Sequence, residues 1–222
     1  GLSSMAAAPT TSLGLVGAVM LGYVLYLGVW CVLIALVSAG MKRRRDALLA
    51  LVALWALSTL LVPRVAPDIA YASQPLPDRL QTEVGIAREL RAMGDSHDPN
   101  DPYFNRFRQS VLDRHSVERI EELSVNYKGL LAIEGERLTS GLFDKYAARS
   151  AAIQHEQNRL VAWFSVLSPS IPLRQLSMAA AATDLSAHLR FLDQAEAHRY
   201  RMVQQLNQLL ADGVSYADDT AR

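Results

Sequence analysis

Cysteine and recognisable catalytic motifs are almost absent from this chain. Its 222 residues include one cysteine, Cys31, which lies inside a run of apolar residues. The rest of the chain therefore has no cysteine for a disulfide or for a thiolate metal site. No GxSxG elbow, Walker lysine loop or HExxH helix occurs, and these motifs mark hydrolases, phosphate-binding loops and zinc sites. We accordingly predict no catalytic, cofactor-binding or metal-binding residues, and a protein that is not an enzyme.

The chain also lacks net charge, because 22 basic residues balance 22 acidic ones. The balance is uneven, however. The segment up to Asp68 has five basic and two acidic residues, and the remainder has 17 basic and 20 acidic residues. The larger part of the chain is thus weakly acidic and has no basic patch of the kind that binds nucleic acid. We expect no nucleic-acid partner.

The sequence does contain two long runs without charged residues. Residues 13–39 contain no charged side chain and exceed the roughly 20 apolar residues that span a bilayer. A buried helix of a large soluble protein is the alternative, but a second apolar run follows at once. We therefore predict a transmembrane helix over residues 13–39. Membrane helices tolerate glycine and use it for close packing, and this run contains Gly14, Gly17, Gly22 and Gly28.

The second apolar run covers residues 47–62, which also carry no charge. It is short for a span, but the segment from Pro63 to Pro67 extends it to the membrane interface. We therefore predict a second transmembrane helix over residues 47–67.

A basic turn, residues 40–46, separates the two runs. It contains Lys42, Arg43, Arg44 and Arg45, and short loops rich in Lys and Arg stay on the cytoplasmic side. We expect a cytoplasmic turn, with residues 1–12 as an extracytoplasmic lead-in and residues 68–222 as a periplasmic domain. The predicted location is the bacterial inner membrane, which the chain crosses more than once. Contact with a cytoplasmic partner subunit is the alternative use of the basic residues.

The first residues indicate a piece of a longer protein. The sequence begins with Gly1 rather than Met, and no charged region precedes the first apolar run. A cleavable signal peptide has such a region. We therefore expect an internal fragment without a signal peptide.

The remainder of the chain has a helical pattern. Apolar residues recur at intervals of three and four, and strand alternation is not convincing anywhere. Gly129, Gly135 and Gly141 each weaken a helix by about 1 kcal/mol relative to Ala, so we expect a bend or break within 129–141. The expected elements are helices over 78–93 and 103–114, a loop over 94–102, a long helical region over 116–167, a chain reversal at Ser168 and Pro169, and a last helical region over 172–211. In this last region we expect Leu176, Leu185, Leu189, Leu192, Val203, Leu206 and Leu210 to face inward.

Polar clusters in this region have structural explanations. The spacing of His188 and His198 is ten residues, which is not the spacing of a helical metal pair, and we interpret the histidines as solvated. The acidic residues lie near Arg119, Lys128 and Arg137, so we expect a salt-bridged surface rather than acid–base chemistry. The histidines are His97, His115, His155, His188 and His198, and the acidic residues are Glu118, Glu121, Glu122, Glu134 and Glu136.

A small-residue stretch, 178–182, precedes Thr183 and Asp184. Either of these two side chains can cap a helix that begins near residue 184. The alanines would allow close helix packing, including against a membrane-embedded helix. Both roles are structural.

A series of landmarks runs along nearly the whole chain. They are Tyr26, Trp30 and residues 35–39; residues 45–51 with Trp55; Pro63 and Arg64; residues 75–77; Leu167 to Pro169; residues 176–179 with Ala182 to Asp184; and Phe191 with Arg199. In order and spacing this series resembles the membrane subunits of ABC-2 type transporters that carry the domain of unknown function DUF3526. In that pattern a glycine usually precedes the Thr-Asp pair, where this chain has Ala182.

The resemblance implies an all-α membrane protein: two transmembrane helices followed by an extracytoplasmic domain with long helices. It implies the permease subunit of an ATP-driven transporter that works as an exporter. ATP and Mg²⁺ would belong to a separate cytoplasmic ABC ATPase subunit. Further partners would be the lipid bilayer, a second permease subunit in a homo- or heterodimer, and a periplasmic protein. The periplasmic helices would gate the exit or dock that protein.

A membrane-anchored helical sensor or scaffold is the alternative function. Such a receptor needs a cytoplasmic output module, whereas the cytoplasmic part expected here is only residues 40–46. A membrane enzyme has no candidate nucleophile or metal site.

Overall fold

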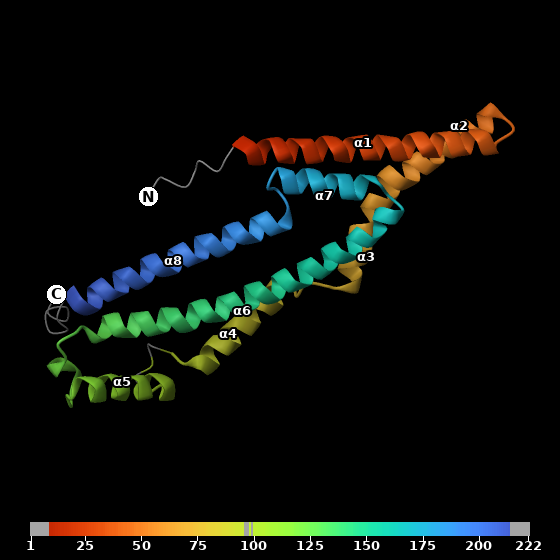
Figure 1. Ribbon diagram of the computed structural model, residues 1–222. Coiled ribbons are helices and arrows are strands. Elements are labelled where there is room, and N and C mark those ends of the chain that lie inside the picture. The colour runs from red at the N-terminus through yellow and green to blue at the C-terminus, as the bar shows by residue number, and fades with distance from the viewer. Residues whose placement is uncertain (1–8, 96–97, 99, 214–222) are drawn as a thin grey trace. The chain divides into compact units, whose positions relative to one another are not determined.

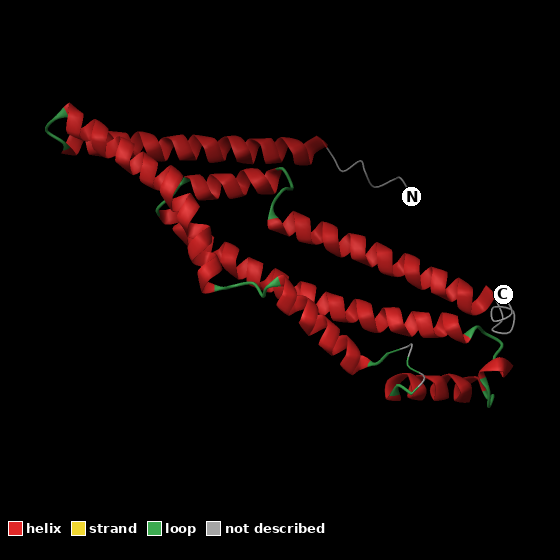
Figure 2. Cartoon of the chain, turned by 180° about the vertical axis from the view of Figure 1, so that it is seen from behind, coloured by secondary structure: helices red, strands yellow, loops and turns green. Residues whose placement is uncertain are grey.

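The computed structural model describes residues 9–95, 98 and 100–213, and this part of the chain contains helices and loops but no strand (Figure 2). The prediction of an all-helical fold is confirmed. The elements in chain order are α1 (Pro9–Gly40), α2 (Arg44–Ala56), the π-helical turn η1 (Leu57–Leu61), α3 (Val62–Ser73), α4 (Arg79–Met93), α5 (Pro102–His115), the 3₁₀ turn η2 (Ile120–Glu122), α6 (Tyr127–Trp163), the 3₁₀ turn η3 (Phe164–Val166), α7 (Ser170–Ala180) and α8 (Leu185–Gly213) (Figure 1).

The chain divides into two compact units. Unit 1 combines residues 1–76 with residues 152–190, and unit 2 combines residues 77–151 with residues 191–222. This division differs from the single domain expected over 68–222, because residues 152–190 belong with the two apolar helices. Each unit is described by itself below.

The first apolar helix of unit 1 confirms the helix predicted from the sequence. α1 includes the whole of residues 13–39, and the turn that follows is short. Only residues 41–43 lie outside helices, and the Arg43 carbonyl accepts the backbone N–H groups of Asp46 and Ala47. Arg44 and Arg45 thus form the first turn of α2 rather than part of the loop.

The second apolar helix is continuous from Arg44 to Ser73. It passes the expected end at residue 67 because two prolines are accommodated within it. Proline has no N–H group and its ring collides with the preceding turn, and the wider π turn at Leu57–Leu61 immediately precedes Pro63. The Ser58 and Thr59 hydroxyls both donate to the Trp55 carbonyl, which gives that carbonyl partners where the backbone ladder changes its spacing.

Small side chains form most of the interior of unit 1, together with Trp30 and Ile171, and most large apolar side chains lie outside. The buried residues of the second helix are Ala47, Ser58, Ala66 and Ala70. Leucines and valines of both apolar helices are exposed, for example Leu25, Leu36, Leu48 and Leu60, each by more than half of its surface. Membrane helices pack in this way, because small residues allow close approach while lipid solvates the large ones.

In unit 2, α4, α5 and α8 are each linked to α6. A small apolar core forms where α5 turns toward α6, from Val111, Leu112 and Leu123. The helices α4 and α5 confirm the predicted 78–93 and 103–114 segments within one or two residues, and Asp101 caps α5 by accepting the Tyr103 and Phe104 N–H groups. The described residues between α4 and α5 form the expected loop.

The start of the predicted long helix was wrong. Residues 116–126 are not continuous helix: Ser116 has a φ of 55°, and Leu123 is extended. Ser116 follows α5 in the left-handed conformation, and the Val117 N–H returns to the Leu112 carbonyl. This helix end sends the chain into η2 before α6 begins.

The bend expected within 129–141 was also wrong, because α6 is one helix of 37 residues. Gly129 has a packing role: it is buried and lies against the backbone of Ala211 on α8. Gly135 and Gly141 have no neighbour within 4 Å of a built Cβ position. The loss of about 1 kcal/mol for each glycine is outweighed by the contacts that α6 makes along its length.

The reversal at Ser168 and Pro169 is confirmed, but the last helical region is two helices. α7 ends at Ala180, and Ala182 has a φ of 53°. The Thr183 N–H donates to Met178 and the Ala182 N–H to Ala179, which is a Schellman helix end. Asp184 then caps α8 through the Ala187 N–H at 3.2 Å, as predicted.

The inward face predicted for residues 172–211 was correct only in part. Leu176, Leu185, Leu189, Val203 and Leu210 are half-buried, whereas Leu192 and Leu206 are exposed. The two exposed leucines belong to the part of α8 in unit 2. There, polar side chains such as Gln204 and Arg199 face α6 instead.

Candidate functional site

A cleft of about 850 Å³ opens in unit 2 between α4, α6 and α8. Its walls mix aromatic and aliphatic surface with carboxylates. The lining residues are Thr82 of α4; Glu136, Thr139, Phe143, Asp144, Tyr146, Ala147 and Ser150 of α6; and Leu192, Asp193, Ala195, Glu196 and Arg199 of α8.

The closed end of the cleft is a polar contact between α6 and α8. The Arg199 guanidinium donates to Glu136 at 2.7 Å and to Glu196 at 2.6 and 2.8 Å, and the Ser140 hydroxyl donates to Glu196 at 3.1 Å. The hydrogen bonds from Arg199 lower the pKa of Glu196 below its usual range, although burial opposes part of this shift. Glu196 is therefore ionised at neutral pH.

Further along the same helix pair, the contacts become tighter. The Gln204 amide donates to the Ile133 carbonyl at 3.1 Å, and the Asn126 N–H donates to the Ala211 carbonyl at 2.7 Å. Asn126 is fully buried, and its side-chain oxygen accepts the Lys128 N–H, so it caps α6 while it binds α8. α6 and α8 are thus joined at Asn126 and held apart at the cleft.

The α4 wall of the cleft depends on Tyr146. Its hydroxyl donates to Glu89 at 3.0 Å, and the Lys145 ammonium donates to the same carboxylate at 2.6 Å. These two bonds, Lys145 first, lower the pKa of Glu89. A Cβ atom at Gly85 would lie 2.7 Å from the Tyr146 hydroxyl, so glycine is what allows the tyrosine to lie against α4.

The exposed parts of the cleft combine apolar surface with negative charge. Phe143 and Leu192 are about half exposed, and Asp144 and Asp193 lie beside them in the sequence and in the lining. Arg199 is the one basic residue among the lining residues, against four carboxylates. An organic cation or a basic peptide segment with an apolar body matches this surface.

The acidic residues singled out in the sequence do not form one site. Glu122 pairs with Arg119 at 2.9 Å and accepts the Glu118 N–H at 3.2 Å, next to η2. Glu134 on α6 accepts from Arg137 at 2.6 Å and from the Tyr103 hydroxyl of α5. Of the five, only Glu136 lines the cleft. The expected ion pairs with Arg119 and Arg137 are present.

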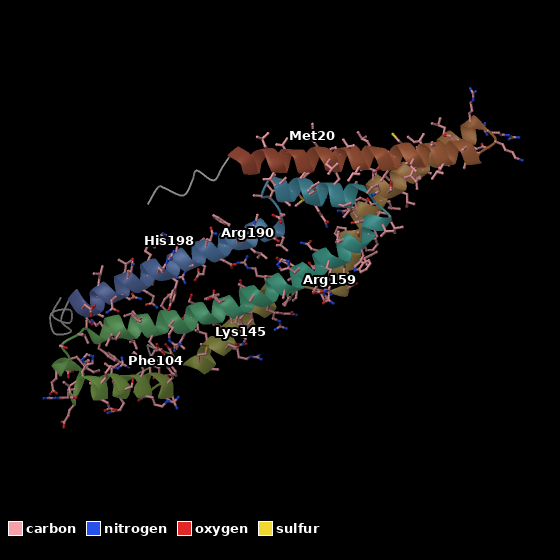
Figure 3. All side chains as sticks on the ribbon, viewed as in Figure 1. Met20, Phe104, Lys145, Arg159, Arg190 and His198 are labelled. Carbon is pink, nitrogen blue, oxygen red and sulfur yellow. The ribbon has the colours of Figure 1, made fainter. Side chains whose placement is uncertain are left out.

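The histidines are dispersed over the helices. His115 ends α5, His155 lies on α6, and His188 and His198 lie on α8, where Figure 3 labels His198; His97 lies outside the described residues. Among the described residues no three His, Cys, Asp or Glu side chains gather as a potential metal site. Cys31 is exposed on α1.

Sequence reasoning missed the cleft and the buried Asn126. Asn126 had a usable signal, because an Asn directly before a periodic segment is an N-cap pattern. The cleft had none, since its residues come from three segments separated by more than 100 positions between Thr82 and Leu192.

Residues 79–219 match the family model of the domain of unknown function DUF3526. The matched segment contains the whole cleft and the chain from α4 to α8. No curated protein and no solved structure matches the chain. Because the family model covers more than half of the sequence, this protein belongs to the DUF3526 family.

Proposed function

We propose that this chain is part of the permease of an ATP-driven ABC-2 type transporter that works as an exporter. The observation that carries the proposal is the combination of a DUF3526 region with two neighbouring apolar helices of 28 and 30 residues. Both are long enough to cross a bilayer. Apart from the buried Trp30, their large side chains face mostly outward, and the buried residues of the second helix are small, as in lipid-solvated helices.

In this proposal the basic turn faces the cytoplasm, and unit 2 lies on the opposite, periplasmic side of the inner membrane. Lys42 and Arg43 lie in the turn, and Arg44 and Arg45 begin α2. Basic residues at this position keep a short loop inside. ATP and Mg²⁺ act on a separate ATPase subunit, and a second permease copy or a related subunit completes the membrane part.

The cleft in unit 2 is then a docking site for a periplasmic partner or a gating element for the exported molecule. This role is supported by the lining of the cleft, which combines apolar walls with carboxylates. Sites of this kind combine an apolar lining with a few polar groups that orient the bound molecule.

The transport function is tested by ATP hydrolysis of the purified permease with and without an ABC ATPase subunit from the same bacterium. We expect hydrolysis only in the complex, with a rate that changes when the complex enters vesicles. Hydrolysis by the permease in a preparation free of the ATPase would refute the proposal. So would an ATPase that never forms a complex with the permease.

The orientation is tested by fusing alkaline phosphatase or a green fluorescent protein after Lys42 and, separately, after Asp78. Alkaline phosphatase folds in the periplasm and the fluorescent reporter in the cytoplasm. We expect phosphatase activity only after Asp78 and fluorescence only after Lys42. The opposite pair of results would reverse the orientation, and equal activity of one reporter at both sites would exclude the second span.

A further inference from the structure

The chain reversal between α6 and α7 in unit 1 has its apolar side chains outside and its polar side chain inside. Trp163, Val166 and Leu167 are exposed by 73%, 85% and 62%, whereas Ser168 is fully buried. In water this arrangement is unfavourable, because about 25 cal/mol is lost for each Å² of apolar surface left exposed. A large exposed apolar patch therefore indicates a surface that something apolar covers.

The polar groups of the reversal are satisfied within it. The Leu167 and Ser168 N–H groups both donate to the Phe164 carbonyl at 3.0 Å, and the Ile171 N–H donates to the Ser168 carbonyl at 3.2 Å. The hydroxyls of Ser168 and Ser170 lie 2.8 Å apart and are hydrogen-bonded. Backbone that enters lipid must be paired internally in this way.

The segment around the reversal is also almost free of charge. From residue 160 to residue 183 Arg174 is the one charged side chain, although the chain on either side carries Arg159 and Asp184. The long aliphatic part of an arginine allows its guanidinium to reach the lipid headgroups from a partly immersed helix. The charge-free part before Arg174, residues 160–173, is longer than any other charge-free stretch after Asp68.

The reversal lies against both apolar helices. α7 runs antiparallel to α1 (Figures 1 and 2), and Leu176 approaches Gly22 so closely that a Cβ there would lie 2.5 Å from its Cδ2. Gly22 precedes Gly40 by eighteen residues, which is about 27 Å of helix. The hydrocarbon core is about 30 Å thick, so Leu176 lies near its far boundary from the basic turn.

The second helix places the reversal in the same half of the spans. Gln157 on α6 donates its amide to the Gln74 carbonyl, just after α3, at 2.6 Å. η3 also contacts α3, so α6 passes beside the second helix. Gln74 follows the end of that helix farthest from Arg44, and Trp163 lies six residues beyond Gln157, about 9 Å along α6. Trp163 therefore lies beside the half of the second helix that is farther from the basic turn.

We propose that residues 160–183 dock into the membrane as a helical reversal in the leaflet opposite the basic turn. The occupant of its exposed surface is lipid, because Trp163, Val166 and Leu167 continue the apolar surface of the two spans. The inference rests on the proposed insertion of α1 and of the helix from Arg44 to Ser73.

The test is quenching of tryptophan fluorescence by lipids that carry a nitroxide at two depths. The full chain is reconstituted in phosphatidylcholine vesicles as two variants, one with Trp163 alone (Trp30→Phe, Trp55→Phe) and one with Trp55 alone (Trp30→Phe, Trp163→Phe). We expect the lipid nitroxides to quench Trp163 and aqueous acrylamide to quench it little. We expect the same of Trp55, which lies eleven residues from Arg44 and is half exposed.

The outcomes separate the two proposals. If the lipid nitroxides quenched Trp55 but not Trp163, the two spans would be in the membrane and the docking of residues 160–183 would be wrong. If both lipid nitroxides and aqueous acrylamide failed to quench Trp163, protein rather than lipid would cover the reversal, and the docking would again be wrong. Unquenched Trp55 as well would overturn the membrane insertion itself.

A second measurement guards against misfolding of the tryptophan variants. Val166→Cys and Arg114→Cys are each made with Cys31→Ala, and both keep all three tryptophans. A membrane-impermeant maleimide should label Arg114→Cys rapidly and Val166→Cys slowly in vesicles, and detergent should abolish the difference. Equal labelling rates in vesicles would overturn the docking.

Discussion

Gly129 on α6 lies so close to α8 that a Cβ atom on it would be 2.5 Å from the Ala211 backbone nitrogen and 2.6 Å from its Cα. No flexible side chain can move to relieve such a contact, because it involves the backbone of a second helix. The close approach also holds the Asn126 N–H within 2.7 Å of the Ala211 carbonyl. These two residues therefore determine how near α6 and α8 can lie.

We expect Gly129→Ala to destabilise unit 2 by about 1–3 kcal/mol, as overpacking does. Gly135→Ala is the matched control, because a Cβ there meets nothing within 4 Å. This control should stabilise the same helix by about 0.5–1 kcal/mol. Thermal unfolding followed by circular dichroism measures both. Stabilisation by Gly129→Ala would show that the two helices are not in contact here.

Ala182→Gly should stabilise the protein by about 1 kcal/mol, because a left-handed residue with a Cβ is strained and glycine is not. Its φ of 53° and the bond from Thr183 to Met178 define the strained position. Ala181, with a φ of −85°, is the control, and Ala181→Gly should not stabilise. Equal melting temperatures for wild type and Ala182→Gly would contradict the assigned helix end.

Glu134 should make stability depend on pH. Hydrogen bonds from Arg137, and secondarily from Tyr103, lower its pKa below the usual 4.5. A carboxylate with a lowered pKa stabilises the fold above its unfolded pKa, and this contribution is lost as the pH falls through the folded pKa. Glu134→Gln should therefore cost about 1–2 kcal/mol at pH 7, and much less under acidic conditions where wild-type Glu134 is itself protonated.

Unfolding in urea at several pH values measures this difference. Tyr103→Phe is the companion variant, because it removes the secondary hydrogen bond and retains Arg137. It should keep most of the pH dependence. If the difference in unfolding free energy between wild type and Glu134→Gln stayed constant from pH 7 to acidic pH, the ion pair could not be the cause of that difference.

Removing Arg199 should open the closed end of the cleft. Arg199→Met leaves Glu136 and Glu196 without their guanidinium partner, so the two carboxylates repel. We expect a lower melting temperature, with part of the loss recovered in high salt because screening weakens the repulsion. Arg199→Lys should retain more stability than Arg199→Met but less than wild type, since lysine cannot bind both carboxylates through a planar fork. A decrease in melting temperature that is the same in low and high salt would indicate lost packing rather than charge repulsion.

The helices could be predicted from sequence where one strong local signal decided them. Proline after Ser168 ended a helix, and apolar periodicity located the helices at 79–93 and 102–115. Local sequence patterns gave wrong predictions where contacts between distant segments determine the structure. Four consecutive alanines predict helix, yet α7 ends inside them at Ala180, and the glycines of α6 predict a break that its long-range contacts prevent. The cleft depends on distances between α4, α6 and α8, which no periodicity encodes.

The π turn at Leu57–Leu61 has a consequence for every residue after it. Such a turn holds one residue more than an α-helical turn, so it works as an insertion that changes the phase of the helix by about 100°. Ala66 and Ala70 are buried in this phase. If the intact sequence were wound as an ordinary α-helix, those alanines would rotate away from the interior, and bulkier neighbours such as Val65 and Ile69 would take their place. Deleting Thr59 together with the π turn would keep Ala66 and Ala70 inside, because the wider turn absorbs one residue. The π turn thus selects which side of α3 is the inside.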